Sequence, residues 1–244
     1  MPAFGRVLLR LFTVQASWNY DRLQGIGFGH AAEPALRALD GGPTGTRYHE
    51  ALAREARFFN AHPYLAGLAV GAAVRSELDG TPPERTERLR EALCGPLGSI
   101  GDRMFWASCL PICAMLGLIA YVLGAGVWSA AVFLVPYNAA HLACRVWGLR
   151  QGWARGHNVV GALQSPVLRL AGRVAAPAAG LVLGAGVPIV LSRQLAGTPT
   201  STALPALIGV LVLAVLLRVL GARLTGLRLT MLVLGLTFIA GLVW

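Results

Sequence analysis

Long apolar runs occupy the second half of the chain and predict membrane-spanning helices. Residues 104–144 contain no Asp, Glu, Lys or Arg over 41 positions. A helix needs about 20 apolar residues to cross a bilayer, so this run is long enough for two spans with a turn at residues 124–126. Three further apolar runs follow, each bounded by Arg or by a polar turn, at residues 174–192, 203–217 and 229–244. We therefore predict an all-α integral membrane protein with about five transmembrane helices.

Residues 1–103 follow a different pattern, with amphipathic stretches and one short apolar run at residues 64–74. Eleven residues are too few to cross a bilayer, so this run is expected to be interfacial, re-entrant or buried in protein. The pattern divides a single domain into an amphipathic and re-entrant helical region, 1–103, and a transmembrane helical region, 104–244.

Two segments of the first region have readable local structure. Residues 47–60 have helical spacing of their apolar positions, which predicts a helix ending near His62 and Pro63. Residues 79–91 are polar and contain two consecutive prolines. They are expected to form a solvated loop that leads into a helix.

The charge of the chain supports the membrane interpretation. The net charge is +10, and residues 103–244 contain ten Arg and no acidic residue, whereas residues 1–102 contain 11 of each. Arg between membrane spans faces the cytoplasm and its anionic lipid. This rule places the segment around Arg103 in the cytoplasm and Trp244 at the external face. Because the Arg residues lie at the ends of apolar runs and not along one polar face, nucleic-acid binding is not expected.

The sequence offers little for catalysis or metal binding. The four cysteines lie in or beside apolar segments, where a free cysteine behaves as a small hydrophobe. They lack the spacing of a zinc site or a redox motif, and the five histidines contain no pair spaced as metal ligands. A membrane-embedded enzyme would need a nucleophile and a base, which we do not find. We therefore expect a non-catalytic protein without metal, cofactor or disulfide.

Two features fall inside the predicted spans. His141 lies near Asn138, and an ionisable residue in a span is a functional candidate by default. A neutral histidine hydrogen-bonded to a neighbouring helix is the commoner case. Gly180 and Gly184 match the close-packing pattern G-x-x-x-G, which is a weak signal in a chain with 30 glycines.

The first of three unusually polar segments begins at Gln15 and continues through Ser17, Trp18 and Asn19. Amides and a hydroxyl around an indole ring are suited to a neutral ligand with many hydroxyls, such as a sugar. The alternative is an amphipathic interfacial helix with Trp18 and Tyr20 among the lipid headgroups, and spacing alone favours it.

The second polar segment, residues 58–63, contains Asn60 before an apolar run. This amide is either a ligand-binding group or a cap for the preceding helix.

The third polar segment, residues 94–106, combines three glycines and a proline with Asp102, just before a long apolar stretch. Irregular backbone at membrane depth is tolerated only in protein or around a cavity, and broken helices mark substrate sites in transporters. One interpretation is therefore a re-entrant loop that presents Asp102 to a ligand. The other makes Asp102 the N-cap of a helix starting at Met104, or the partner of Arg103.

Together these segments resemble the IID subunit of the mannose-fructose-sorbose family of the bacterial phosphoenolpyruvate-dependent sugar phosphotransferase system. The resemblance is carried, in the family's order, by QASWNYDRLQGIGF (15–28), FFNAHPYLAG (58–67), GPLGSIGDRMFW (95–106) and residues 137–156. It covers roughly residues 8–192, beyond which only the hydropathy matches.

The resemblance implies a multi-pass protein of the bacterial cytoplasmic (inner) membrane that pairs with a homologous subunit, IIC, to bind and translocate a hexose. It implies that IIA and IIB carry the phosphoryl group, that IID has no phosphorylated residue, and that three IIC–IID pairs assemble as a trimer. The sugar would lie between the two subunits. The site residues that this implies are Gln15, Ser17, Trp18, Asn19, Asn60 and Asp102.

Two positions differ from the family pattern. The family usually has Gly-Asp-Pro where this chain has Gly101, Asp102 and Arg103, and an Arg where His141 follows Asn138. An Arg beside Asp102 adds a charge that, by pairing with the carboxylate, would withdraw it from sugar binding. This leaves a second hypothesis: a degenerate IID-like protein with a regulatory or assembly role and no sugar transport.

Overall fold

The computed structural model describes residues 1–196, and the regular elements in this range are helices. In chain order they are α1 (Phe4–Leu11), α2 (Gly25–Leu36), η1 (Gly42–Thr44), α3 (Thr46–Glu55), α4 (Ala66–Leu78), α5 (Pro83–Gly101), η2 (Asp102–Cys109), α6 (Leu110–Ala120), η3 (Tyr121–Ala125), α7 (Trp128–Arg155), η4 (Gly156–Asn158), α8 (Val160–Leu163) and α9 (Pro166–Gln194). Elements η1 and η4 are 3₁₀-helices, whereas η2 and η3 are π-helical. The predicted all-α class is confirmed.

The chain divides by its contacts into two compact units, Met1–Val190 and Leu191–Trp244. The features described below belong to the first unit. Strand-like pairing in the described residues is limited to two isolated bridges, which join Asn19 to Leu23 and Leu23 to Phe59.

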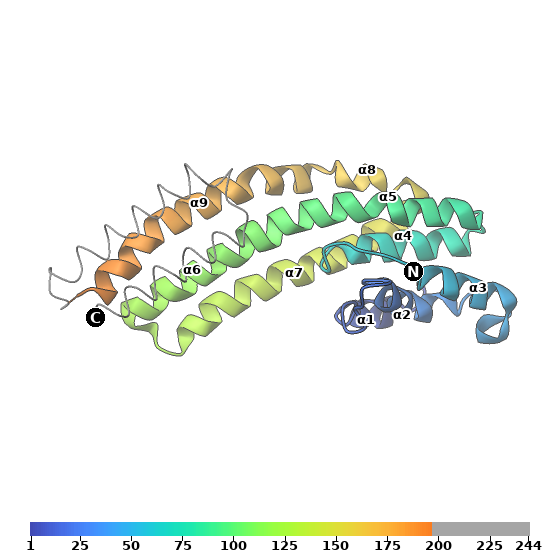
Figure 1. The fold of residues 1–244 in the computed structure, drawn as a ribbon, viewed down its shortest axis with the longest axis horizontal. Helices are drawn as coiled ribbons and strands as arrows, with labels where there is room; N and C mark the ends of the chain where they lie inside the picture. Colours follow the sequence, from blue (N-terminus) through green and yellow to red (C-terminus); the bar gives the residue numbers. More distant parts are fainter. Residues whose placement is uncertain (197–244) are drawn as a thin grey trace. The chain divides into compact units, whose positions relative to one another are not determined.

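One helical stretch of 43 residues runs from Pro83 to Ala125 through α5, η2, α6 and η3, and its backbone stays helical up to the kink at Gly124. At 1.5 Å per residue it is about 64 Å long, roughly twice the apolar thickness of a bilayer. Its charged first part therefore extends beyond the membrane, while its charge-free part can cross. Val160–Gln194 is the second helix of the described range that is long and apolar enough to span. Figure 1 shows α5 and α6 as one rod beside α7.

The predicted turn of the hairpin is confirmed. The chain reverses between η3 and α7, where Gly124 and Gly126 have φ angles of 92° and 53°, values that glycine adopts without strain. α7 then packs along α6 on its return. α7 contains polar residues and is less apolar than the two helices that qualify as candidate spans, Pro83–Ala125 and Val160–Gln194. The count of five spans stays a prediction, because the runs at 203–217 and 229–244 lie outside the described residues.

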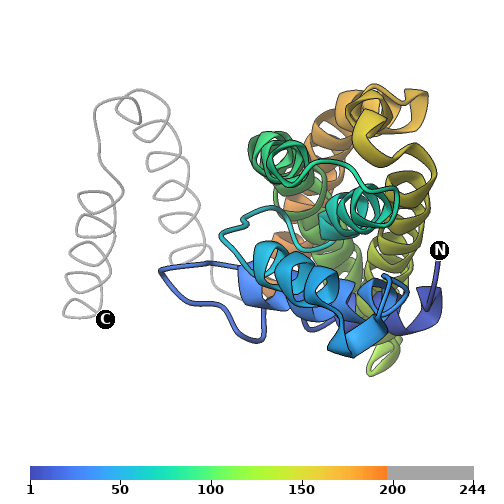
Figure 2. The ribbon, with the colours of Figure 1, turned by 90° about the vertical axis from the view of Figure 1, so that its right-hand side faces the viewer.

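Helix α4 decides between the three alternatives for the apolar run at residues 64–74. Nearly every residue of α4 is buried within the protein. The helix packs along α7 and also contacts α1, α2, α5 and η4 (Figures 1 and 2). The run is therefore a protein-buried core helix.

Glycines allow α4 and α7 to approach closely. Each helix has two glycines four residues apart, Gly67 and Gly71 on α4 and Gly148 and Gly152 on α7. A Cβ added to Gly71 would lie 2.6 Å from the carbonyl oxygen of Leu149, and one on Gly152 would lie 2.1 Å from that of Leu68. Only residues without a Cβ permit this contact, which follows the small-xxx-small packing of membrane helices.

The glycine pair that we noted in the sequence has no such role among the described residues. A Cβ on Gly180 or Gly184 would meet no atom of that part of the chain within 4 Å. The informative G-x-x-x-G pairs are those at Gly67 and Gly148, which the sequence analysis did not single out.

The helix predicted at residues 47–60 is present as α3, but it ends at Glu55. The following residues pair instead with the chain that precedes α2. The backbone N–H of Gln24 donates to the carbonyl of Phe59 at 2.9 Å, and that of Phe59 donates to the carbonyl of Arg22 at 3.3 Å. These bonds satisfy the backbone outside a helix.

The loop predicted at residues 79–91 is shorter than expected, because α5 already begins at Pro83. Proline suits the first helical position, where its missing N–H removes no helical hydrogen bond. The same long helix crosses residue 103 without a break, and the division into regions 1–103 and 104–244 stays a prediction.

The re-entrant loop predicted for residues 94–106 is wrong. α5 continues through Pro96 into η2, and Asp102 has helical φ and ψ angles of −61° and −43°. The alternative of an N-cap is also wrong, because no helix begins there. One glycine of this segment serves close packing instead of a chain break, since a Cβ on Gly101 would lie 2.2 Å from the Cβ of His62.

Gly152→Ala is expected to destabilise the protein because the new methyl group cannot fit between α4 and α7. Overpacking of this kind costs typically about 1–3 kcal/mol. The measurement is the unfolding temperature of the purified protein in detergent. Gly180→Ala is the matched control, and its unfolding temperature should stay unchanged or rise slightly. Equal unfolding temperatures for Gly152→Ala and the wild type would contradict the packing described here.

Candidate functional site: a polar cavity beside the long helix

A cavity of about 560 Å³ lies beside the middle of the long helix. Its walls come from the turn after α1, the residue before α2, the segment that precedes α4, and parts of α5 and η2. The residues that line it are Gln15, Gln24, Phe58, Asn60, Ala61, His62, Pro63, Cys94, Gly95, Gly98, Ser99, Asp102 and Trp106. Its size is typical of small-molecule sites. It lies where the long helix changes from charged to charge-free sequence.

Arg90 of α5 fixes the end of α3, next to one wall of the cavity. Its buried guanidinium donates to the carbonyl oxygens of Arg54 at 2.6 Å and of Glu55 and Arg57 at 3.2 Å. These carbonyls lie at the end of α3 and just after it, where carbonyls lack the full set of N–H partners of a helix interior. Arg90 also pairs with the buried carboxylate of Glu55 at 3.1 Å. The long helix therefore holds the segment that leads into the cavity wall.

Gln24 holds the same wall from the opposite side. Its side-chain nitrogen donates to the carbonyl oxygen of Ala61 at 2.7 Å. Its side-chain oxygen is buried and has no hydrogen-bond partner among the described residues. An unpaired buried acceptor costs about 1–3 kcal/mol, so a donor entering the cavity would relieve that cost.

His62 connects the wall to the π-helical segment. Its ring stacks on Phe105 with 5.2 Å between ring centroids, and it meets Trp106 edge-on at 5.7 Å. Nδ1 accepts the backbone N–H of Tyr64 at 3.3 Å, so the neutral ring carries its proton on Nε2. Burial, and to a lesser degree Arg145, lowers the pKa of His62 to about 4. The ring is therefore neutral at pH 7.

Three of the six predicted site residues come together in the cavity. Gln15, Asn60 and Asp102 line it, and all three side chains are exposed. Asn60 does not cap α3, which ends five residues earlier at Glu55. The three segments that looked unusually polar in the sequence thus each contribute one predicted residue to one site.

The other three predicted residues, Ser17, Trp18 and Asn19, do not line the cavity. Asn19 stabilises a turn instead, since its side-chain oxygen accepts the backbone N–H groups of Asp21 at 3.0 Å and Arg22 at 2.8 Å. Its side-chain nitrogen donates to the carbonyl of Ser17 at 3.1 Å. The alternative of an amphipathic helix is wrong here, because these residues form turns and a bridge.

The cavity residues that the sequence did not predict include Gln24, His62, Ser99 and Trp106. Two of them, Ser99 and Trp106, could have been found from their helical spacing relative to Asp102. Ser99, Asp102 and Trp106 recur at spacings of three and four residues and so share one helix face. That phase is readable only once the glycine-rich segment is known to be helical. Gln24 and His62 carry no local signal that distinguishes them from other polar residues.

Asp102 and Arg103 do not pair. No ion pair joins them in the described structure, and Nε of Arg103 donates to the carbonyl oxygen of Ser99 at 3.3 Å. Asp102 lines the polar cavity, whereas Arg103 lines a separate one. The carboxylate is therefore available to a ligand.

His141 is a hydrogen-bonded residue on α7, as the commoner interpretation holds, but its partner belongs to the same helix. Its Nε2 lies 2.9 Å from the side-chain oxygen of Asn138. Its ring stacks on Tyr64, whose hydroxyl lies 2.9 Å from that of Tyr137. This cluster joins α7 to the segment before α4 and does not line the polar cavity.

The chemistry of the cavity suits a neutral polyol. Amides at Gln15 and Asn60 can donate and accept hydrogen bonds, and the carboxylate of Asp102 accepts strong ones. The half-exposed indole of Trp106 offers an apolar face to ring carbons. Clusters of three or more potential metal ligands are absent from the described residues.

His62 should make stability depend on pH. The unfolded chain binds a proton to histidine below about pH 6.5, and the folded protein does so only below about 4. Stability from this group is therefore complete above pH 6.5 and falls by up to about 3 kcal/mol as the pH drops to 4. Unfolding temperatures measured across this range should fall less for His62→Phe, which keeps a ring on Phe105. Parallel curves for the two proteins would contradict the assignment.

Comparison with known proteins agrees with these features. The chain matches the family model of the PTS system mannose/fructose/sorbose family IID component over residues 3–243. It is 29% identical to the fructose permease IID component of Bacillus subtilis (strain 168) over 190 residues, 72% of this chain and 68% of that protein. It is 28% identical to the mannose-specific EIID component of Escherichia coli (strain K12) over 200 residues, 77% and 70% of the two chains.

Two solved structures are similar to this chain. The cryo-EM structure of the mannose transporter ManYZ in complex with microcin E492 has a chain that is 27% identical, with a TM-score of 0.59, covering 75% of this chain and 68% of that one. A second structure, described only as a membrane protein, has a TM-score of 0.75 at 22% identity and covers 98% and 94% of the two chains, which supports the fold alone. Since the family model spans almost the whole sequence, the chain belongs to the IID components of the PTS mannose/fructose/sorbose family.

Proposed function

We propose that this IID component pairs with a IIC subunit in the bacterial cytoplasmic membrane, and that the pair binds a hexose and moves it inward for phosphorylation by phospho-IIB. The observation that carries the proposal is the polar cavity. It gathers amides, a carboxylate and an indole ring at the level where the long helix changes from charged to charge-free sequence.

The cavity residues have distinct roles in this proposal. Asp102 accepts hydrogen bonds from two neighbouring sugar hydroxyls, because a carboxylate is an acceptor with two oxygens. Asn60 and Gln15 bond further hydroxyls, and Trp106 packs on the ring carbons. The unpaired oxygen of Gln24 accepts one more hydroxyl hydrogen or a bridging water. The exposed sides of Asp102 and Trp106 leave room for a partner subunit to close the cavity.

Family membership supports the wider assembly. IID components are membrane subunits of a sugar transport system and are not catalytic on their own, so the phosphoryl group in our proposal comes from IIA and IIB. The similar ManYZ structure is that of a mannose transporter complex, which supports a membrane partner for this chain. We extend this to a multi-pass protein in a trimer of IIC–IID pairs.

One observation favours transport over the alternative of a degenerate, purely regulatory IID-like protein. That alternative rested on the departures at Arg103 and His141, and at the first of these on an ion pair between Arg103 and Asp102. The two side chains line different cavities and form no ion pair in the described part of the chain. The departure at Arg103 therefore leaves the carboxylate of the polar cavity free.

Asp102→Asn should weaken sugar uptake in membrane vesicles that contain the full chain with IIC, IIA and IIB. The amide keeps the shape but loses the charge-assisted hydrogen bonds, each of which contributes about 1.5–3 kcal/mol. We expect KM for a transported hexose to rise roughly ten- to a hundredfold. The measurement is phosphosugar accumulation as a function of external sugar.

Asp21→Asn is the matched control, since Asp21 is exposed and lies outside the cavity. Its uptake should equal that of the wild type, and co-purification with IIC should be unchanged for both variants. Wild-type kinetics in Asp102→Asn would remove Asp102 from the site. A wild-type complex that assembles but accumulates no phosphosugar with any hexose would favour the regulatory alternative.

A further inference from the structure

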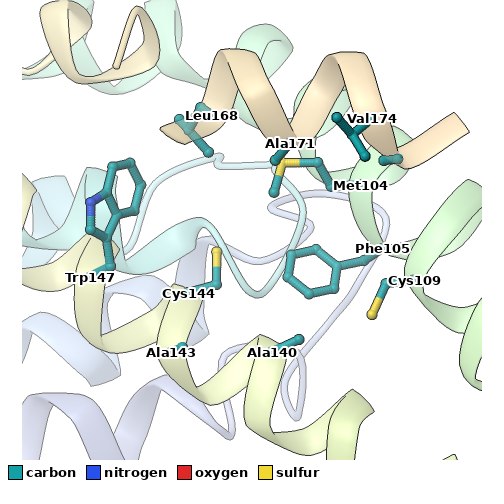
Figure 3. Close-up of a pocket in the computed structure, with 11 residues that line it drawn as sticks. Met104, Phe105, Cys109, Ala140, Ala143, Cys144, Trp147, Leu168, Ala171 and Val174 are labelled. Carbon is teal, nitrogen blue, oxygen red and sulfur yellow. The ribbon is translucent and has the colours of Figure 1, made fainter. Parts of the chain in front are cut away.

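A second cavity, on another side of the long helix, is almost entirely apolar. It has a volume of about 520 Å³ and lies between η2, α7 and α9. Figure 3 shows Met104 and Phe105 of η2 facing Cys144 and Trp147 of α7, with Ala171 of α9 closing the opposite side. It has none of the amide or carboxylate groups of the sugar site. A groove of this kind in a membrane protein suits a hydrocarbon chain.

The apolar groove continues into a basic cavity of about 370 Å³. The two share Met104 and Leu168, so they are contiguous. Three guanidinium groups line the basic cavity, from Arg103 on η2 and from Arg169 and Arg173 on α9. No acidic residue lines it.

These cations lack a counter-ion in the described structure. The side chain of Arg103 donates only to a backbone carbonyl, and the side chains of Arg169 and Arg173 form no hydrogen bond or ion pair with other described residues. All three side chains are exposed. Like charges that face one cavity repel each other, and an anion bound between them removes that repulsion. Guanidinium groups bind phosphate well, because their planar N–H groups match its oxygen atoms in bidentate pairs.

The order of the two cavities along the helices matches that of a lipid in a bilayer. On the long helix the basic cavity involves residues 100–104, and the apolar groove involves residues 104–109. On the last described helices the corresponding ranges are 163–173 and 168–175. On both candidate spans the residues of the apolar groove follow those of the basic cavity along the chain. The Arg residues therefore lie at one end of the groove.

We propose that the two cavities together bind one anionic phospholipid of the membrane. The phosphate lies among Arg103, Arg169 and Arg173, and one acyl chain fills the groove between η2, α7 and α9. A free phosphate ion would use the three cations but not the adjoining groove. The positive-inside rule places these Arg residues at the cytoplasmic leaflet, where anionic lipids are found. This site is separate from the sugar cavity and does not depend on transport.

Native mass spectrometry of the full-length chain, purified in detergent, tests the proposal. The probes are phosphatidylglycerol and phosphatidylcholine with identical acyl chains, added at equal concentration. An Arg at the membrane surface contributes about 1 kcal/mol towards anionic lipid, so three of them predict a preference for phosphatidylglycerol of about a hundredfold. Arg169→Gln with Arg173→Gln leaves only Arg103 in the basic cavity and should reduce that preference to about fivefold.

Two controls separate the site from general effects. Arg85→Gln with Arg88→Gln removes two exposed Arg that line neither cavity, and it should keep the preference. Ala171→Phe fills the groove without changing charge, and it should lower the binding of both lipids. Inorganic phosphate in large excess competes for the cations alone, so it should lower the preference for phosphatidylglycerol without removing the lipid from the groove.

The outcomes that overturn the proposal are distinct. A preference unchanged in the Arg169 and Arg173 variant would exclude these cations as the headgroup site. An equal loss in the Arg85 and Arg88 variant would show that net charge alone attracts the lipid. Wild-type lipid binding by Ala171→Phe would exclude the groove, and complete displacement of both lipids by inorganic phosphate would make this a free-phosphate site. Circular dichroism of each variant verifies that it is folded.

Discussion

The close contact of α4 with α7 is the constraint on which the rest of the structure depends. Glycines at Gly71 and Gly152 bring the two backbones within a distance that no Cβ permits. This contact joins the N-terminal helices to the hairpin of α6 and α7 through a core helix that is itself too short to span a bilayer. The segment that precedes α4 is thereby held against the long helix, where His62 packs on Gly101. The polar cavity forms between these two elements.

The same long helix lines two different cavities, one with the carboxylate of Asp102 and one with the guanidinium group of Arg103. Consecutive residues of a helix point about 100° apart, so Asp102 and Arg103 line different cavities. The carboxylate lies in the polar cavity with amides and an indole ring. The guanidinium lies with two further Arg at the end of an apolar groove. A broken or re-entrant chain at this point would not separate the two charges in this way. The uninterrupted helix is therefore part of the function that we propose.

The sequence predicted the features that depend on composition. The charge-free run at residues 104–144 and its two glycines were sufficient to predict the helical hairpin and its turn. The order of the sequence motifs was sufficient to predict the family. The sequence could not predict the features that depend on tertiary contacts. The glycines before Asp102 looked like a chain break, although one of them permits close packing against His62. Asn19 looked like a ligand group, although its side chain completes a turn. Gln24 lines the cavity and donates a hydrogen bond to Ala61, 37 residues away, and such a long-range contact cannot be read from local sequence.

The most direct test of the account is the structure of this chain in complex with IIC and a transported hexose. The account predicts that sugar hydroxyls lie within hydrogen-bond distance of Asp102 and Asn60, with the indole of Trp106 against the ring. It also predicts that the long helix stays continuous through residue 102. A hexose bound elsewhere in the complex, with this cavity containing only water, would contradict the central claim.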